Sequence, residues 1–135
     1  MIRRVAIAVV GASMVGMAFG LVKPDLLLSF IGFSISDPGV AGYQLGEVRA
    51  VYGGLFLVIG VFTLLSAIDP VANRPRLVVL GWCWLGLGGG RLVGVLVDGD
   101  PGLRGWAFIV GELGAGALVL ACTMPTNDAS RRQGS

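Results

Sequence analysis

The chain has 135 residues, of which 55% are hydrophobic and 13% charged, and its mean hydropathy is +0.84. This composition lies far outside that of a soluble globular domain, so the chain belongs in a lipid bilayer. The net charge of +2 comes mostly from residues that flank the apolar runs, so it requires no nucleic-acid partner. The absence of histidine removes the commonest general base and transition-metal ligand, so we expect no metal and no other cofactor.

The first apolar run covers residues 5–22 and is long enough to cross a bilayer. Crossing ~30 Å of hydrocarbon takes about 18 to 20 residues of helix. A cleaved signal peptide is the alternative, because Arg3 and Arg4 precede the run and small residues end it. We favour a retained helix, since the apolar core of a signal peptide has only about 7 to 15 residues.

A shorter apolar stretch, residues 26–35, follows the first span and is too short to cross the membrane. Pro24 precedes it and a turn sequence follows it, so we expect an interfacial or re-entrant segment. The next apolar run, residues 46–67, is the second predicted span.

The third and fourth predicted spans cover residues 77–97 and 106–124, and short polar loops connect the last three spans. Short loops favour antiparallel neighbours, so the sequence predicts an all-α, up-down four-helix bundle in one integral membrane domain, residues 1–124. Glycines four residues apart, such as Gly86 and Gly90, allow such helices to approach closely. Residues 125–135 are expected to form a flexible cytoplasmic tail.

Lysine and arginine are divided unequally between the two sides of these spans. Lys23 and Arg104 fall on one side, and the other side carries Arg3, Arg4, Arg74, Arg76, Arg131 and Arg132. The more basic side normally faces the cytoplasm. The sequence therefore predicts cytoplasmic N and C termini.

The ionisable residues within the spans collect in the outer half of the predicted bundle. Arg91 lies roughly 10 Å below the end of its helix and Glu112 roughly 9 Å below Trp106, so the two share a depth. An arginine at a helix centre costs ~2.5 to 3.5 kcal/mol on insertion scales, so it requires a partner or a wet cavity. We expect Arg91 to pair with Glu112, with Glu47 as the second candidate.

This cluster has two interpretations. In the first, a structural network of ion pairs fixes which helices meet. In the second, Glu47, Arg49, Arg91 and Glu112 form the floor of a pocket, because intramembrane ionisable residues commonly mark functional sites. The two interpretations are compatible.

Helical phase suggests further residues that would contact a ligand. Tyr52 shares a face with Arg49 on the second span, and Trp84 and Asp98 share a face with Arg91 on the third. We therefore include Tyr52, Trp84 and Asp98 as candidate ligand-binding residues.

The pocket interpretation favours acid–base chemistry on a lipophilic molecule, such as epoxide opening, double-bond isomerisation or cyclisation. Glu47 and Glu112 in unequal surroundings could divide the acid and base roles, with Arg49 and Arg91 stabilising developing negative charge. The sequence has no nucleophile elbow, phosphate loop or metal-ligand spacing, so it leaves open whether the protein is an enzyme. The alternative is a non-catalytic bundle that assembles with itself or with a larger membrane partner.

Three stretches resemble a bacterial family of small four-helix membrane proteins known only as a domain of unknown function. They are GEVRAVYGGLFLVIG at 46–60, GRLVGVLVDG at 90–99 and GELGAGALVL at 111–120. The resemblance covers roughly residues 20–122 and implies the same fold and a bacterial cytoplasmic membrane, but no activity. The matching signature positions are Glu47, Arg49, Tyr52, Gly53, Gly54, Gly90, Arg91, Gly94, Asp98, Gly99 and Glu112.

Overall fold

The structure is a computed structural model that describes residues 1–32 and 41–124. Every regular element in this part of the chain is helical, so the all-α prediction is confirmed. The elements are α1 (Ile2–Met17), the 3-10 turn η1 (Ala18–Leu21), α2 (Pro24–Ile31), α3 (Ala41–Val48), the π-helical segment η2 (Arg49–Leu55), α4 (Phe56–Ile68), α5 (Arg74–Asp98) and α6 (Gly102–Thr123). Two expected features fall wholly or partly outside the described residues, namely the tail at 125–135 and the end of the segment at 26–35.

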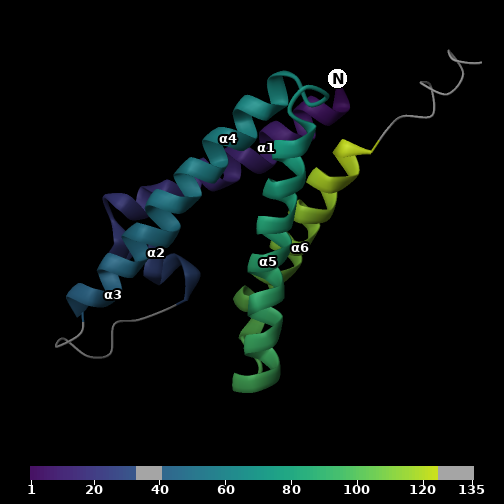
Figure 1. Ribbon diagram of the computed structural model, residues 1–135. Helices are drawn as coiled ribbons and strands as arrows, with labels where there is room; N and C mark the ends of the chain where they lie inside the picture. Colours follow the sequence, from purple (N-terminus) through teal and green to yellow (C-terminus); the bar gives the residue numbers. More distant parts are fainter. Residues whose placement is uncertain (33–40, 125–135) are drawn as a thin grey trace, which may run out of the picture.

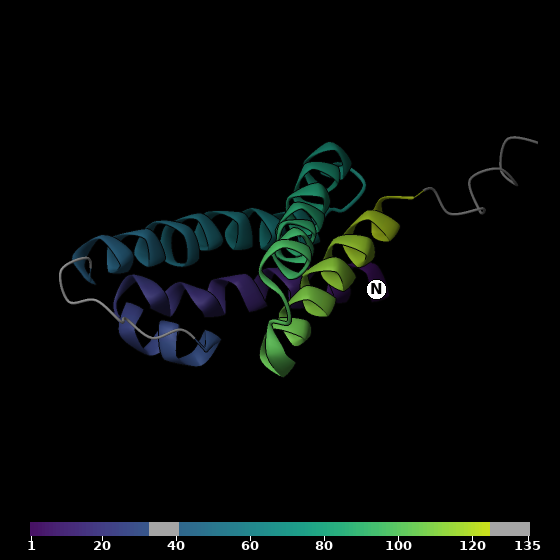
Figure 2. The same ribbon diagram turned by 90° about the horizontal axis from the view of Figure 1, so that it is seen from below.

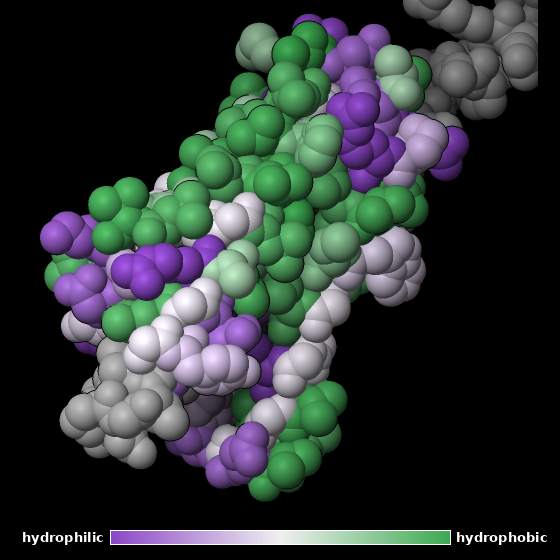
Figure 3. All heavy atoms as spheres, turned by 60° about the vertical axis from the view of Figure 1, so that its left-hand side comes forward, coloured by the Kyte–Doolittle hydropathy of each residue, from purple (hydrophilic) through white to green (hydrophobic). Residues whose placement is uncertain are grey.

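Within the described residues, four continuous helices are long and apolar enough to cross a membrane. They cover Ile2–Leu21, Gly42–Ile68, Arg74–Asp98 and Gly102–Thr123, and each overlaps one of the predicted spans. Large apolar side chains on these helices, such as Val58 and Val110, are more than half exposed. Figure 3 shows one face on which hydrophobic residues cover the middle and hydrophilic residues gather toward both ends. Such a surface indicates a membrane protein.

The helix ends follow from local sequence. Pro24 occupies the start of α2, where its missing N–H costs nothing, and Asp25 lies in the positive first turn. Gly32 ends α2 with φ +90, a left-handed conformation that glycine adopts without strain. After α4, the carboxylate of Asp69 accepts hydrogen bonds from two backbone N–H groups of the following turn. These signals separate the apolar helices with short connections.

The four long helices form two antiparallel pairs, α1 with α4 and α5 with α6 (Figures 1 and 2). Glycine allows the backbones of each pair to touch. A Cβ added to Gly60 would lie 2.9 Å from the carbonyl oxygen of Gly11, and one added to Gly116 would lie 2.9 Å from that of Gly81. Consecutive long helices run in opposite directions, as an up-down fold requires.

The glycine pair Gly86 and Gly90 does not serve this packing. A Cβ added to either residue would meet no described atom within 4 Å. The contact face of α5 instead presents Gly81 and Gly88 to α6. The four-residue spacing therefore pointed to glycines of α5 that do not face α6.

The two helix pairs meet near the α4–α5 connection and lean apart toward their other ends (Figure 1). Where they meet, the buried side chains of Ile7, Met14, Leu77, Trp84 and Val119 belong to one core cluster. Below this cluster, the space between the pairs forms a pocket. The short helix α2 lies at the open side of this space, where Phe30 packs edge to face on Phe108 of α6.

Candidate functional site

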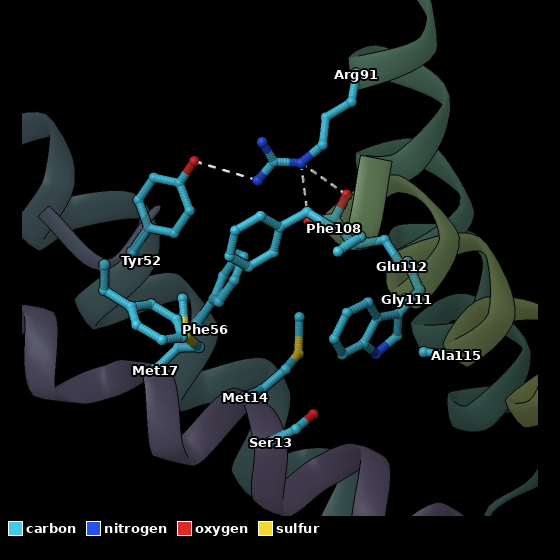
Figure 4. A pocket seen from close by; sticks show the side chains of 13 residues that line it. Ser13, Met14, Met17, Tyr52, Phe56, Arg91, Phe108, Gly111, Glu112 and Ala115 are labelled. Carbon is cyan, nitrogen blue, oxygen red and sulfur yellow. Dashed lines mark hydrogen bonds and ion pairs between the residues drawn. The ribbon is translucent and has the colours of Figure 1, made fainter. Parts of the chain in front are cut away.

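A pocket of about 280 Å³ lies between the two helix pairs, and most of its lining is apolar (Figure 4). Its walls come from α1, α2, the η2–α4 helix, α5 and α6. Ser13 of α1, Phe30 of α2, and Ala107 and Gly111 of α6 line the pocket and are also exposed, so these three helices border its opening. The lining residues are Ser13, Met14, Met17, Phe30, Tyr52, Phe56, Trp84, Arg91, Ala107, Phe108, Gly111, Glu112 and Ala115.

An ion pair between Arg91 and Glu112 forms the polar part of this pocket. Nε of Arg91 donates hydrogen bonds to both carboxylate oxygens of Glu112, at 3.0 Å to Oε1 and 2.9 Å to Oε2. The Glu112 side chain is 6% exposed and that of Arg91 25%. The predicted pairing is therefore present, with the carboxylate buried and the guanidinium partly open.

Two aromatic rings hold the guanidinium of Arg91 in place. The hydroxyl of Tyr52 accepts a long hydrogen bond of 3.4 Å from Nη2, and the Phe108 ring lies 5.3 Å from the guanidinium carbon. Figure 4 shows the guanidinium reaching from α5 to a position between Tyr52 and Glu112. The Nη1 donors have no hydrogen-bond partner among the described residues. The cation therefore keeps donor capacity for a molecule in the pocket.

Tyr52 reaches this position from the π-helical segment η2. Segments of this kind are rare and occur often at functional sites, because the wider turn redirects side chains. Gly53 anchors the segment, since an added Cβ there would lie 2.9 Å from the backbone nitrogen of Leu21. The Tyr52 ring also packs on Phe56, with ring centroids 5.2 Å apart.

Trp84 lines the same pocket two helical turns before Arg91. The residue is 7% exposed, and its indole N–H has no hydrogen-bond partner among the described residues. A buried donor without a partner costs roughly 1–3 kcal/mol. Of the predicted site residues, the structure thus brings together Tyr52, Trp84, Arg91 and Glu112.

The other three predicted site residues lie away from the pocket. Glu47 and Asp98 are exposed, and neither lines it. Arg49 is also exposed, and its Nε donates to the carbonyl oxygen of Leu21 at 3.3 Å. The expectation that Arg49 and Tyr52 share a face assumed the α-helical period, which the wider π-helical turn does not keep. Of the four charged residues predicted to form the floor, only Arg91 and Glu112 line the pocket.

Sequence reasoning did not identify several residues that shape the pocket. Met14 and Met17 come from α1, where an apolar residue in an apolar run carries no signal of its own. Phe108 was more accessible to prediction, because it lies one turn before Glu112 on the same face of α6.

Around the ion pair the site offers a carboxylate, a partly free guanidinium and a phenol hydroxyl, and its otherwise apolar lining also includes the indole of Trp84 and the hydroxyl of Ser13. Arg91 and Tyr52 are placed to hydrogen-bond an oxygen atom of a bound molecule, and Glu112 is placed to accept a proton. Among the described residues, no group of three or more Cys, Asp or Glu side chains is arranged to hold a metal ion.

Comparison with known proteins places the chain in a family without assigning a reaction. No curated protein and no solved structure matches it significantly. One family model matches residues 2–123, which is nearly the whole chain, and it is described as a domain of unknown function. The residues that suggested such a family, from Glu47 to Glu112, lie within this match. The chain therefore belongs to the domain-of-unknown-function family DUF4345.

Proposed function

We propose that this protein binds a lipophilic small molecule in the pocket between its two helix pairs. The observation that carries the proposal is the Arg91–Glu112 pair in the wall of an otherwise apolar cavity. Pockets for small molecules typically combine apolar walls with a few convergent polar groups. An apolar molecule with one or two oxygen atoms suits this combination.

A purely structural role accounts less well for the pair. The pair joins α5 to α6, and these helices already touch through Gly81 and Gly116. Polar contacts between membrane helices contribute ~0.6 to 1.7 kcal/mol, which is less than the ~2.5 to 3.5 kcal/mol that an arginine costs at a helix centre. The partly open guanidinium also keeps donors that a closed structural pair would use.

We further propose that the pocket lies in the outer half of a bacterial cytoplasmic membrane, with both termini in the cytoplasm. The support is the distribution of cations, because Arg3, Arg4, Arg74 and Arg76 lie at one end of the spans and Lys23 and Arg104 at the other. Arg91 and Glu112 are nearer to the less basic end. A ligand would reach them from the outer leaflet through the opening that α1, α2 and α6 border.

The chemistry that this arrangement permits is the isomerisation of a double bond next to a carbonyl group. Glu112 would remove a proton from one carbon and return it to another, so that no atom is gained or lost. Arg91 and Tyr52 would hydrogen-bond the carbonyl oxygen as negative charge develops on it. A division of acid and base roles between two glutamates has no support, because Glu47 lies outside the pocket.

Tryptophan fluorescence tests the binding proposal. The chain has three tryptophans, and changing Trp82 and Trp106 to phenylalanine leaves Trp84, which lines the pocket. A monoacylglycerol with a brominated acyl chain quenches a tryptophan that it contacts. In lipid nanodiscs of non-brominated lipid, we expect saturable quenching of Trp84.

Two glycines of α6 provide a matched pair of variants for this assay. Gly111 lines the pocket and Gly114 does not, yet a Cβ added to either would meet no described atom within 4 Å. We expect Gly111→Leu to weaken the quenching about tenfold or more, because the side chain fills the opening, whereas Gly114→Leu leaves it unchanged. Equal behaviour of the two variants would overturn the pocket proposal. It would favour the alternative, a non-catalytic subunit whose ion pair is only structural.

A further inference from the structure

A second cavity adjoins the pocket at the end of the molecule where α6 begins. It measures about 390 Å³ and is lined by Phe30, Arg104, Ala107 and Phe108. Three of these residues, all except Arg104, also line the first pocket. The two cavities therefore share a wall at the Phe30–Phe108 contact, where the ring centroids are 6.3 Å apart.

One face of α6 runs along both cavities. Arg104, Phe108 and Glu112 follow one another at steps of four residues, so they lie on the same side of the helix. The eight residue steps from Arg104 to Glu112 correspond to about 12 Å along the helix axis. A cation at the helix start is thus followed by an aromatic ring and then by the ion pair.

Arg104 is suited to bind an anion at the outer end of this path. Its Nη1 donates to the backbone carbonyl oxygen of Ser29 at 3.3 Å, which leaves other donors of the guanidinium for a ligand. That bond joins the start of α6 to α2 and holds the side chain at the second cavity. The N-terminal end of α6 adds a favourable partial positive charge.

We propose that the ligand is an anionic single-chain amphiphile, whose phosphate or carboxylate head group binds Arg104 and whose chain passes Phe30 and Phe108 to the Arg91–Glu112 pair. This proposal rests on the proposed function, because the chain occupies the same pocket. The two cavities follow one another along a single face of α6, which suits one acyl or isoprenoid chain. Arg91 and Tyr52 then contact an oxygen on the chain about 12 Å below the head group.

The test compares two brominated probes that differ by one phosphate, a lysophosphatidic acid and the monoacylglycerol with the same acyl chain. Quenching of Trp84 is measured in nanodiscs of zwitterionic lipid, in the protein that lacks Trp82 and Trp106. We expect the phosphate-bearing probe to bind about tenfold more tightly, as charge-assisted hydrogen bonds to arginine allow.

Arg104→Gln should remove this preference and leave the affinity for the neutral probe unchanged, whereas Arg104→Lys should keep most of it. Lys23→Gln is the control, because it removes another cation from the less basic end of the spans but lies outside both cavities. It should preserve the tenfold preference. Inorganic phosphate at millimolar concentration should not compete, since it lacks the chain.

The outcomes separate the two proposals. If the neutral probe quenches Trp84 but the phosphate gives no preference, or Arg104→Gln retains the preference, the head-group proposal is wrong and the pocket stands. Competition by inorganic phosphate would also overturn it, in favour of a site for a free anion. If neither probe gives saturable quenching, both proposals fail.

Discussion

The Arg91–Glu112 pair predicts a measurable coupling between two side chains of different helices. The perturbation is a double-mutant cycle with Arg91→Gln, Glu112→Gln and the combined variant. Each single change leaves one charge of the pair without its partner. The combined change leaves two neutral amide groups that can still bond to each other.

The structure sets the expected size of the effect. Removing one partner of a buried ion pair costs ~3 to 5 kcal/mol in soluble proteins, whereas cycles between membrane helices average ~0.6 and reach ~1.7 kcal/mol. The bond from Nε to Oε2 is short at 2.9 Å, but the Arg91 side chain is 25% exposed and keeps Tyr52 as a partner. We therefore expect each single variant to lose about 1–2 kcal/mol and the coupling energy to be about 1 kcal/mol.

The assay is reversible unfolding in mixed micelles by titration with dodecyl sulfate, followed by circular dichroism. Glu47→Gln is the matched control, because Glu47 is exposed and lies outside the pair, so this change should alter the free energy of unfolding by less than about 0.5 kcal/mol. The exchange Arg91→Glu with Glu112→Arg should recover part of the stability that either reversal alone removes. Additive single effects, together with no recovery on exchange, would refute the pairing.

Two further predictions concern helix packing and orientation. Gly116→Ala should destabilise the protein by about 1–3 kcal/mol in the same unfolding assay, because its Cβ would lie 2.9 Å from the backbone oxygen of Gly81. Gly114→Ala on the same helix is the control. Its Cβ meets no described atom within 4 Å, so this change should be neutral or stabilising. An equal effect of both changes would contradict the α5–α6 contact. In a protein with Cys83 and Cys122 replaced by alanine, Asn73→Cys in intact cells should resist a membrane-impermeant maleimide and Asp100→Cys should react. The reverse pattern would overturn the proposed orientation.

The helical class and the ion pair could be predicted from the sequence because the alternatives to each carry a large free-energy cost in a bilayer. Apolar runs long enough to cross a bilayer leave few alternatives to a helix, since every backbone polar group must be satisfied within the segment. Arg91 and Glu112 share a depth and have opposite charges, so pairing them lowers the free-energy cost of placing each charge in the membrane.

The sequence could not reveal which surfaces of the helices face each other. Glycine packing depends on helix rotation, so Gly86 and Gly90 were as plausible as Gly81 and Gly116 until the helices were in place. The π-helical segment that separates Arg49 from Tyr52 changes the local period, and a fixed α-helical phase cannot anticipate such a change. The second cavity required tertiary structure, because Phe30 and Arg104 are far apart in the chain.

The geometry of the pair bears directly on why a small membrane protein would keep it. Glu112 is buried, and it satisfies one edge of the guanidinium and fixes its position, while the Phe108 ring covers one face of the cation. The other donors of Arg91 face a mostly apolar pocket, where a donor that has no partner is unfavourable. A lipophilic molecule that brings an oxygen atom to these donors relieves that cost, whereas a saturated hydrocarbon chain does not. If the proposed function is correct, we therefore expect the pocket to prefer oxygenated over saturated lipophilic molecules, because these donors are the one feature of the site that a structural ion pair would not need.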